Sequence, residues 1–182
     1  MPKPPKIILG VTGSIAAYKA VELLRLMQRK GWDVWVVMTE CATQYVGPLT
    51  FRALSLHPVP TGFYASMDPE GYTHLGLTEQ AAVMVVAPCS ANTMARLAHG
   101  LAEDVLSAAA LSMDGPLLIA PAMNVKMWMN PATQENAATL ARRGATIVPP
   151  GCGALACGAT GAGRLAKLVD IIAAVENILP AG

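Results

Sequence analysis

The chain contains 182 residues, which corresponds to one compact domain, since a domain averages about 150 residues. Hydrophobic residues make up 53% of it and charged residues 14%, whereas an average soluble domain has roughly 25% charged residues. This composition excludes an intrinsically disordered chain, and the net charge of +1 gives no strong field that would attract nucleic acid or anionic lipid. The shortage of charge predicts that copies of the same chain cover part of the surface.

The sequence also lacks the marks of a membrane or secreted protein. Its longest uncharged stretch, residues 144–163, is rich in glycine and contains two prolines, so it does not form a lipid-facing helix. The first six residues, Met-Pro-Lys-Pro-Pro-Lys, lead into an apolar strand without a signal-peptide core, which predicts a cytoplasmic protein. A reducing compartment predicts no disulfide framework, and the isolated pair Cys152 and Cys157, with no histidine nearby, predicts no metal site.

Apolar runs of strand length alternate with segments of helical periodicity along the whole chain. We predict buried strands at Lys6–Thr12, Asp33–Thr39, Ala82–Ala87, Pro116–Pro121 and Ala145–Val148. We predict helices at Ser14–Lys30, residues 40–56 (in two pieces broken at Gly47 and Pro48), Ala91–His99, Glu103–Met113, Pro131–Arg143 and Lys167–Leu179. Residues 57–72 are predicted as loop or short edge strand, and the glycine-rich residues 149–163 as loop.

This alternation predicts a single α/β domain over residues 1–182. The strands are almost entirely apolar, which is typical of a parallel sheet with helices on both faces. We therefore expect a three-layer, Rossmann-like (flavodoxin-like) fold. Ligands of such sheets bind outside the carboxyl ends of the strands, so the loops after Thr12, Thr39, Ala87, Pro121 and Val148 are the candidate site.

Three of these loops are more polar or richer in small residues than a connection requires. Gly13–Lys19 opens a helix with small residues, which suits a phosphate or, alternatively, forms a tight turn in which Ser14 caps the helix. Pro88–Thr93 offers several hydrogen-bonding side chains, either to a ligand with polar edges or as redundant helix caps. Pro121–Pro131 contains three methionines, a tryptophan and two asparagines, which fit the wall of a planar ring, a subunit contact or a core segment.

Two further residues are chemical candidates. Cys157 lies among glycines in the loop after the last predicted strand, where it is either a structural cysteine or a thiol on a mobile flap. His74 lies shortly before the third predicted strand and is either a structural histidine or a catalytic one. The residues around them do not decide between these interpretations.

Five stretches, taken together, resemble a known family. In chain order they read GSIAAYK at 13–19, THLGL at 73–77, APCSANT at 87–93, PAMNVKMW at 121–128 and ACGATGAGRL at 156–165. They span nearly the whole chain, and the last two are specific in combination. The pattern is similar to that of the homo-oligomeric, flavin-containing cysteine decarboxylases.

The resemblance implies FMN as the cofactor, with its phosphate region held by Gly13, Ser14 and Ile15. It implies further cofactor contacts from Thr39, Ser90, Ala91, Asn92, Thr93 and Ala122. It implies His74 as the active-site histidine, Cys157 as a proton donor and Asn124 as the residue that binds the substrate carboxylate. Residues 149–164 would form a substrate flap in which the clamp is made by Ala154, Leu155 and Ala156.

The implied activity is decarboxylation of 4'-phosphopantothenoylcysteine to 4'-phosphopantetheine in coenzyme A biosynthesis. A cysteine carboxylate has no electron sink, so oxidation of the thiol to a thioaldehyde is what makes loss of CO2 possible. Relatives that act on peptidyl cysteines release the enethiol and need no proton-donating cysteine, so Cys157 favours the coenzyme A reaction. The alternatives are a peptidyl-cysteine decarboxylase, a flavin prenyltransferase-like flavoprotein and a non-catalytic regulatory subunit of the same fold.

The resemblance also implies an assembly. Members of the family form trimers or dodecamers, with the flavin at a subunit boundary, and the decarboxylase is expected either to stand alone or to work with a separate phosphopantothenate–cysteine ligase. The chain departs from the family at Ala82, where an acidic residue is usual, so a helix or subunit contact is expected to differ there. Neither nucleic acid nor a membrane is expected as a partner.

Overall fold

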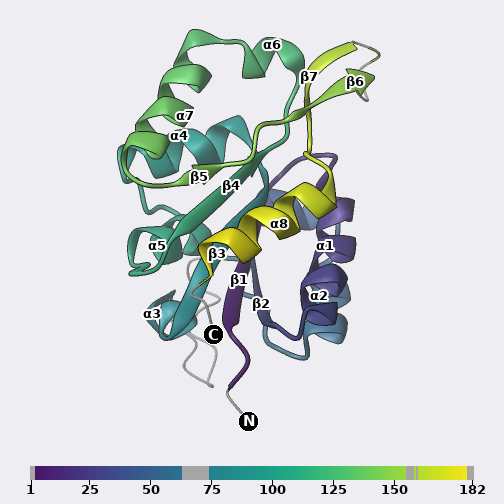
Figure 1. Cartoon of the computed structure of the whole chain (residues 1–182), viewed down its shortest axis with the longest axis vertical. Coiled ribbons are helices and arrows are strands. Elements are labelled where there is room, and N and C mark those ends of the chain that lie inside the picture. Colours follow the sequence, from purple (N-terminus) through teal and green to yellow (C-terminus); the bar gives the residue numbers. More distant parts are fainter. Residues whose placement is uncertain (1–2, 63–73, 155–157, 159, 180–182) are drawn as a thin grey trace.

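The computed structural model describes residues 3–62, 74–154, 158 and 160–179. Five strands form one parallel sheet in the order β2-β1-β3-β4-β5 (Figure 1). These strands are β1 (Lys6–Val11), β2 (Asp33–Met38), β3 (Ala81–Cys89), β4 (Leu117–Pro121) and β5 (Thr146–Ile147). The helices are α1 (Ala17–Arg29), η1 (Glu40–Gln44), α2 (Pro48–Ser55), α3 (His74–Thr78), α4 (Ala91–His99), α5 (Val105–Leu111), α6 (Val125–Trp128), α7 (Pro131–Arg142) and α8 (Leu168–Ile178).

The sheet separates two hydrophobic cores. Successive side chains of a strand point to opposite faces, so Ile7 and Leu9 of β1 enter the core that contains residues of α1, α2 and α8. Ile8 enters the other core, which contains residues of α4, α5 and α7. Each of these side chains is fully buried, and such burial stabilises the fold by about 1.5–3 kcal/mol per side chain. The predicted three-layer α/β architecture with a parallel sheet is therefore confirmed.

The last glycine-rich segment differs from the prediction. The sequence predicts a loop over 149–163, but β6 (Gly151–Ala154) and β7 (Thr160–Arg164) pair antiparallel and project beyond the sheet (Figure 1). Three glycines within these two strands have positive φ angles, namely 149° at Gly153, 157° at Gly161 and 156° at Gly163. Glycine is rare in ordinary strands, so the composition that permits this backbone also hides the strands from a propensity argument.

Two short helices also escape the sequence prediction. α6 lies within the Pro121–Pro131 segment and has only four residues, too few to show helical periodicity. α3 has five residues and begins at His74, directly before β3. Each of these helices begins at or next to a residue that the family resemblance assigns to the active site.

The helices of the described part are short. α1, the longest of them, has 13 residues, which corresponds to about 20 Å. A membrane-spanning helix must cross a hydrocarbon core of about 30 Å. Within residues 3–62, 74–154, 158 and 160–179, no helix is both long and apolar enough to do so.

Candidate functional site

Buried hydrogen bonds tie the carboxyl ends of β1, β3 and β4 together. Thr12 follows β1 and is fully buried; its Oγ1 donates to Pro88 O at 2.8 Å and accepts from Ser90 N at 2.8 Å. Ala122 follows β4, and its N–H donates to Cys89 O at 3.0 Å. The loops after these three strands therefore lie side by side at the edge of the sheet where parallel α/β proteins bind ligands.

The turn between β1 and α1 requires its glycine. A Cβ atom on residue 13 would overlap Cys41 Sγ, so Gly13 allows the two segments to approach. Ser14 Oγ accepts a hydrogen bond from Ala16 N and donates one to Ala122 O, both at 3.3 Å. Ala16 is the N-cap of α1, without a side-chain cap, so the alternative in which Ser14 caps the helix is wrong. Ser14 instead connects the turn to the loop after β4.

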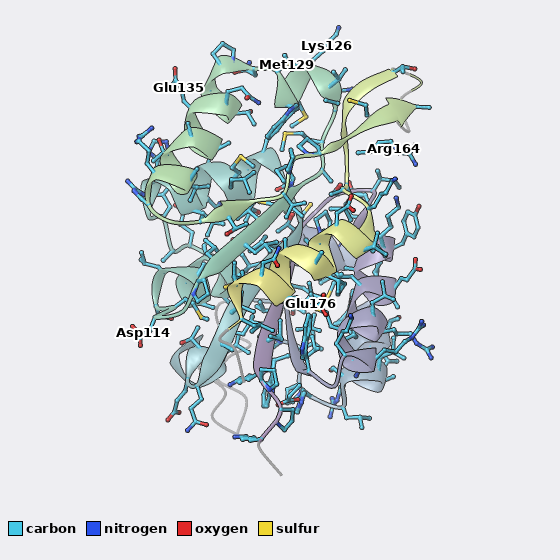
Figure 2. The ribbon with its side chains drawn as sticks, viewed as in Figure 1. Asp114, Lys126, Met129, Glu135, Arg164 and Glu176 are labelled. Carbon is cyan, nitrogen blue, oxygen red and sulfur yellow. The ribbon has the colours of Figure 1, made fainter. Side chains whose placement is uncertain are left out.

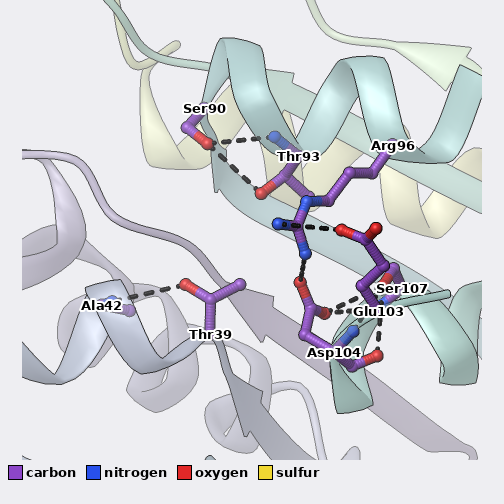
Figure 3. A network of polar contacts seen from close by, with 8 residues as sticks. All are labelled: Thr39, Ala42, Ser90, Thr93, Arg96, Glu103, Asp104 and Ser107. Atoms are coloured by element: carbon purple, nitrogen blue, oxygen red, sulfur yellow. Dashed lines mark hydrogen bonds and ion pairs between the residues drawn. The ribbon is translucent and has the colours of Figure 1, made fainter. Parts of the chain in front are cut away.

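The first turn of α4 contains the polar cluster that follows β3. Ser90 is its N-cap: the Oγ atom accepts from Thr93 N and donates to Thr93 Oγ1, both at 3.2 Å (Figure 3). Thr93 is buried, whereas Asn92 is exposed. Further along α4, Arg96 pairs with Asp104 at 2.9 Å and so connects the helix to the start of α5 (Figure 3). The cluster therefore serves partly as a helix cap, as one of the two alternatives predicts.

Five segments surround a cavity of about 460 Å³, which we call the main cavity. They are the turn before α1, the end of η1, the β3–α4 loop, the β4–α6 loop and the β6–β7 hairpin. Its volume lies within the range of about 300–1,000 Å³ that is usual for small-molecule sites. The residues assigned to the site by the family resemblance that line it are Gly13, Ser14, Ile15, Ser90, Ala91, Ala122, Asn124 and Ala154.

Asn124 lies on the wall of the main cavity as the N-cap of α6. Its Oδ1 accepts a hydrogen bond from Lys126 N at 2.8 Å. That bond orients the amide, whose Oδ1 is an acceptor and whose Nδ2 is a donor. Asn124 is half-buried and lies on a cavity, so the alternative of a core segment does not hold at this residue.

Some predicted site residues do not line the main cavity. Thr39 Oγ1 accepts from Ala42 N at 3.3 Å, so this nearly buried side chain caps η1 (Figure 3). Asn92 and Thr93 belong to the first turn of α4 and also lie outside the lining. Three more predicted residues lie outside the described part of the chain, namely Leu155, Ala156 and Cys157.

His74 lies far from the main cavity of its own protomer. It begins α3, which precedes the amino end of β3, whereas Ser90 follows the carboxyl end of the same strand. β3 has nine residues, and at about 3.3 Å per residue it separates the two ends by roughly 30 Å. Figure 1 shows α3 at the end of the molecule opposite to the β6–β7 hairpin. One protomer therefore does not bring His74 to its own main cavity.

Sequence reasoning gave several residues of the lining no individual role. These are Ala16, Tyr18, Lys19, Tyr45, Met123, Met127, Gly163, Arg164 and Leu165. All except Tyr45 lie inside the stretches that carry the family resemblance, so their position in those stretches is the signal that could have identified them. Tyr45 follows η1 and has no comparable signal.

The described cysteines differ in chemical character. Cys89 is fully buried in β3, and burial raises the pKa of its thiol well above the ordinary value, so it stays protonated and inert. Cys41 and Cys152 are exposed. Of the three, none lines the main cavity, so a catalytic thiol at this site would have to come from Cys157.

The lining of the main cavity fits a flavin nucleotide. Two charged residues occur among its described members, Lys19 and Arg164, and both are positive, which favours a phosphate. Ser14 and Ser90 supply hydroxyl groups, while Met123 and the other apolar members offer a surface for a flat ring system. The glycine turn at the end of β1 lets the backbone approach a ligand closely.

Comparison with known proteins now identifies the family. The family model described as "Flavoprotein" matches residues 1–179. The chain belongs to the flavoprotein family. It is 44% identical over 176 residues to the probable phosphopantothenoylcysteine decarboxylase of Streptococcus mutans, covering 96% of this chain and 98% of that protein. It is 43% identical over 176 residues to the coenzyme A biosynthesis bifunctional protein CoaBC of Mycobacterium bovis, but this match covers only 42% of that longer protein.

Solved structures of flavoproteins have the same fold. A mutant PPC decarboxylase in complex with pantothenoylaminoethenethiol superposes with a TM-score of 0.83 at 30% identity, over 96% of this chain and 97% of that chain. The FMN binding protein AtHal3 gives a TM-score of 0.80 at 31% identity, over 97% and 96% of the two chains. The family resemblance predicted from the five stretches is thus confirmed.

Proposed function

We propose that this flavoprotein is an FMN-dependent decarboxylase that converts 4'-phosphopantothenoylcysteine into 4'-phosphopantetheine in coenzyme A biosynthesis. The observation that carries the proposal is the convergence of four segments of the family's sequence stretches on one cavity, in the fold shared with PPC decarboxylase. Identity of 44% with a probable phosphopantothenoylcysteine decarboxylase over nearly its whole length supports the choice of substrate.

The reaction has one requirement that decides the chemistry. When CO2 leaves a cysteine carboxylate, the electron pair of the broken C–C bond must be accepted, and a thiol cannot accept it. A thioaldehyde can, because the pair moves onto sulfur and leaves an enethiolate. FMN, when bound, supplies the two-electron oxidation that creates the thioaldehyde and the reduction that completes the product.

The chain's own residues bind the substrate and move a proton. We assign the substrate carboxylate to the amide of Asn124, which faces the main cavity from the start of α6. We assign the clamp over the substrate to residues 149–164, of which Ala154 and Arg164 line the cavity. After CO2 leaves, the carbon that carried it takes a proton from Cys157, and the enethiolate becomes the thioaldehyde tautomer that is then reduced.

We further propose a homotrimer, or a dodecamer built of trimers, in which each site is shared. Ile15 and Tyr18 on the rim of the main cavity are 62% and 61% exposed, and Met127 and Met129 beside it are 48% and 62% exposed. Large apolar side chains around a ligand cavity favour a covering subunit. Such a neighbour would also bring a His74 to the cavity, which a single protomer does not do.

We place the enzyme in the cytoplasm and beside a phosphopantothenate–cysteine ligase. Phosphate esters do not cross membranes, so a phosphorylated substrate has to be consumed in the compartment where it is made. The bifunctional relative supports the second partner, because a coenzyme A biosynthesis protein with two activities contains a segment 43% identical to this chain. We regard residues 1–182 as one functional domain.

Mass spectrometry after mixing the purified holoprotein with 4'-phosphopantothenoylcysteine tests the reaction. The proposal expects loss of CO2 with all hydrogens restored, which gives 4'-phosphopantetheine. Accumulation of a product that has lost CO2 and two hydrogens would instead indicate the peptidyl-cysteine type of reaction. A protein that stays colourless after addition of FMN and releases no CO2 would be a non-catalytic member of the fold, and the proposal would be refuted.

Substitution of Cys157 by serine separates the two halves of this reaction. The Cys157→Ser variant is expected to release CO2 but to accumulate the enethiol, because a serine hydroxyl is a far weaker acid than a thiol. The Cys152→Ser variant, which changes the exposed thiol of β6, serves as the control and should form the full product. Full turnover by the Cys157→Ser variant would show that Cys157 is not the proton donor.

Mixing two impaired variants tests the shared site. His74→Ala and Asn124→Ala homotrimers are each expected to have at most a small fraction of the wild-type activity, because every site lacks one of its residues. In trimers assembled from equal amounts of both, about a quarter of the sites combine an intact His74 with an intact Asn124, so activity should return to about that fraction. The mixture would stay as impaired as the two homotrimers if each site used both residues of one protomer.

A further inference from the structure

A second cavity borders the main cavity. It measures about 870 Å³ and lies between α1, the base of the β6–β7 hairpin and the start of α8; we call it the side groove. Lys19, Arg164 and Leu165 line both spaces, so the two are neighbours with a common wall. Figure 2 shows Arg164 on the flank of the molecule where the hairpin meets α1.

The side groove leads away from the main cavity along α1. Its lining on this helix runs from Lys19 through Glu22 to Leu26, seven residues further on. At 1.5 Å per residue this corresponds to about 10 Å. On the opposite side the groove is lined by Leu168 and by Asp170, from the first turn of α8. The side groove is therefore long enough along α1 to hold a tail of several bonds.

Positive charges prevail in the side groove. Its described lining contains three cations, Lys19, Arg164 and Lys167, and two acids, Glu22 and Asp170. Within the described part of the chain, none of these five side chains makes an ion pair or a side-chain hydrogen bond. Surface cations that already neutralise an acid have little to offer a ligand, whereas these three keep their donors available.

We propose that the side groove binds the phosphorylated tail of the substrate, with Arg164 and Lys167 as the residues that select its terminal phosphate. The inference rests on the proposed function, because that function supplies the tail. Beyond the cysteine, the tail carries two amides, a carbon with two methyl groups and a phosphate at its far end. Leu26 and Leu168 offer apolar surface to the methyl groups, and the cations offer charge-assisted hydrogen bonds to the phosphate.

Arg164 and Lys167 lie on consecutive elements, β7 and the residue that caps α8. A guanidinium can bind two phosphate oxygens at once, and an ammonium adds a point charge. Lys19, at the common wall, is close enough to serve either space. The groove thus distinguishes a phosphorylated small molecule from a peptidyl cysteine, whose neighbouring residues carry no phosphate.

Calorimetric titration of the FMN-loaded protein tests the inference with 4'-phosphopantetheine and pantetheine, which differ only in the phosphate. The wild type is expected to bind the phosphorylated compound at least about tenfold more tightly, as fits charge-assisted contacts to a dianion. Arg164→Gln and Lys167→Gln should each reduce this ratio by about tenfold. Arg25→Gln, which removes an exposed cation of α1 outside both spaces, is the matched control and should keep the ratio.

Each outcome separates the inference from the proposed function. Equal binding of both compounds by the wild type, or an unchanged ratio in both variants, would overturn the role of the groove. Loss of flavin absorbance in Lys167→Gln would also overturn it, by assigning the charge to the phosphate of the cofactor. A protein that binds 4'-phosphopantetheine more tightly than pantetheine, as expected, but releases no CO2 from 4'-phosphopantothenoylcysteine would support the role of the side groove and refute the proposed reaction.

Discussion

Replacing Asn124 by alanine is expected to reduce kcat/KM for 4'-phosphopantothenoylcysteine by about 10- to 150-fold. A hydrogen bond to a charged group contributes about 1.5–3 kcal/mol, and each 1.36 kcal/mol corresponds to about tenfold in rate. Asn124 lies on the main cavity and its amide is oriented by Lys126 N. Steady-state kinetics with a CO2 assay gives the measurement, and the flavin absorbance shows whether the cofactor is still bound.

Asn130 provides a matched control for the structural part of this effect. It caps α7 in the same way that Asn124 caps α6: its Oδ1 accepts from Ala132 N at 3.0 Å, and the acceptor bond of Asn124 measures 2.8 Å. Asn130 is absent from the described lining of the main cavity. Both alanine variants should therefore lose about 1 kcal/mol of unfolding free energy, but only Asn124→Ala should lose activity. Equal losses of activity in the two variants would mean that Asn124 acts only as a helix cap.

Replacing Gly163 by alanine is expected to disrupt two walls of the main cavity at once. A Cβ atom at this position would overlap the carbonyl oxygen of Met123, and Met123 N donates to Gly163 O at 2.9 Å. The φ angle of 156° adds backbone strain to the clash. Because a backbone atom cannot rotate away as a side chain can, the hairpin and the β4–α6 loop must separate. We expect a destabilisation of about 3 kcal/mol or more and loss of bound flavin.

Gly144 separates the strain of a positive φ angle from the clash. Its φ is 93°, and a Cβ atom there would meet nothing within 4 Å. Gly144→Ala should therefore cost about 1–2 kcal/mol, the usual penalty for a left-handed alanine, and retain the flavin. Denaturant unfolding of both variants, together with the flavin absorbance, gives the comparison. Similar destabilisation in the two variants would mean that the walls of the cavity are not held by the close contact at Gly163.

The sequence predicts the sheet well because each strand is an apolar run and the segments between the strands show helical periodicity. Residues 81–89 and 117–121 are examples in which burial on both faces leaves no polar position to confuse the pattern. The two pieces of helix around Gly47 are also confirmed, since Pro48 is a favourable first residue for α2. The parallel order of strands then follows, because the helices must return the chain to the same edge.

What sequence reasoning misses has local causes. Glycines 153, 161 and 163 adopt backbone angles that no propensity scale associates with strands, so β6 and β7 read as a loop. The sequence groups His74 with the other site residues, but the length of β3 separates it from the main cavity of its own protomer. Residues that come together only between two copies of a chain leave no periodic pattern in its sequence. The side groove likewise joins α1 and α8, which are distant in sequence.

The hydrogen bonds at the carboxyl edge of the sheet have a consequence for folding. Thr12 Oγ1 reaches Pro88 O across 76 positions of the chain, and Ser14 Oγ reaches Ala122 O across 108. The first contact requires that β3 has joined β1, and the second requires that β4 has joined as well; contacts between such distant residues close late and slowly. A nascent chain that ends before Ala122 therefore lacks one wall of the main cavity, and a change in the spectrum of added FMN during refolding is expected only after β4 has joined the sheet.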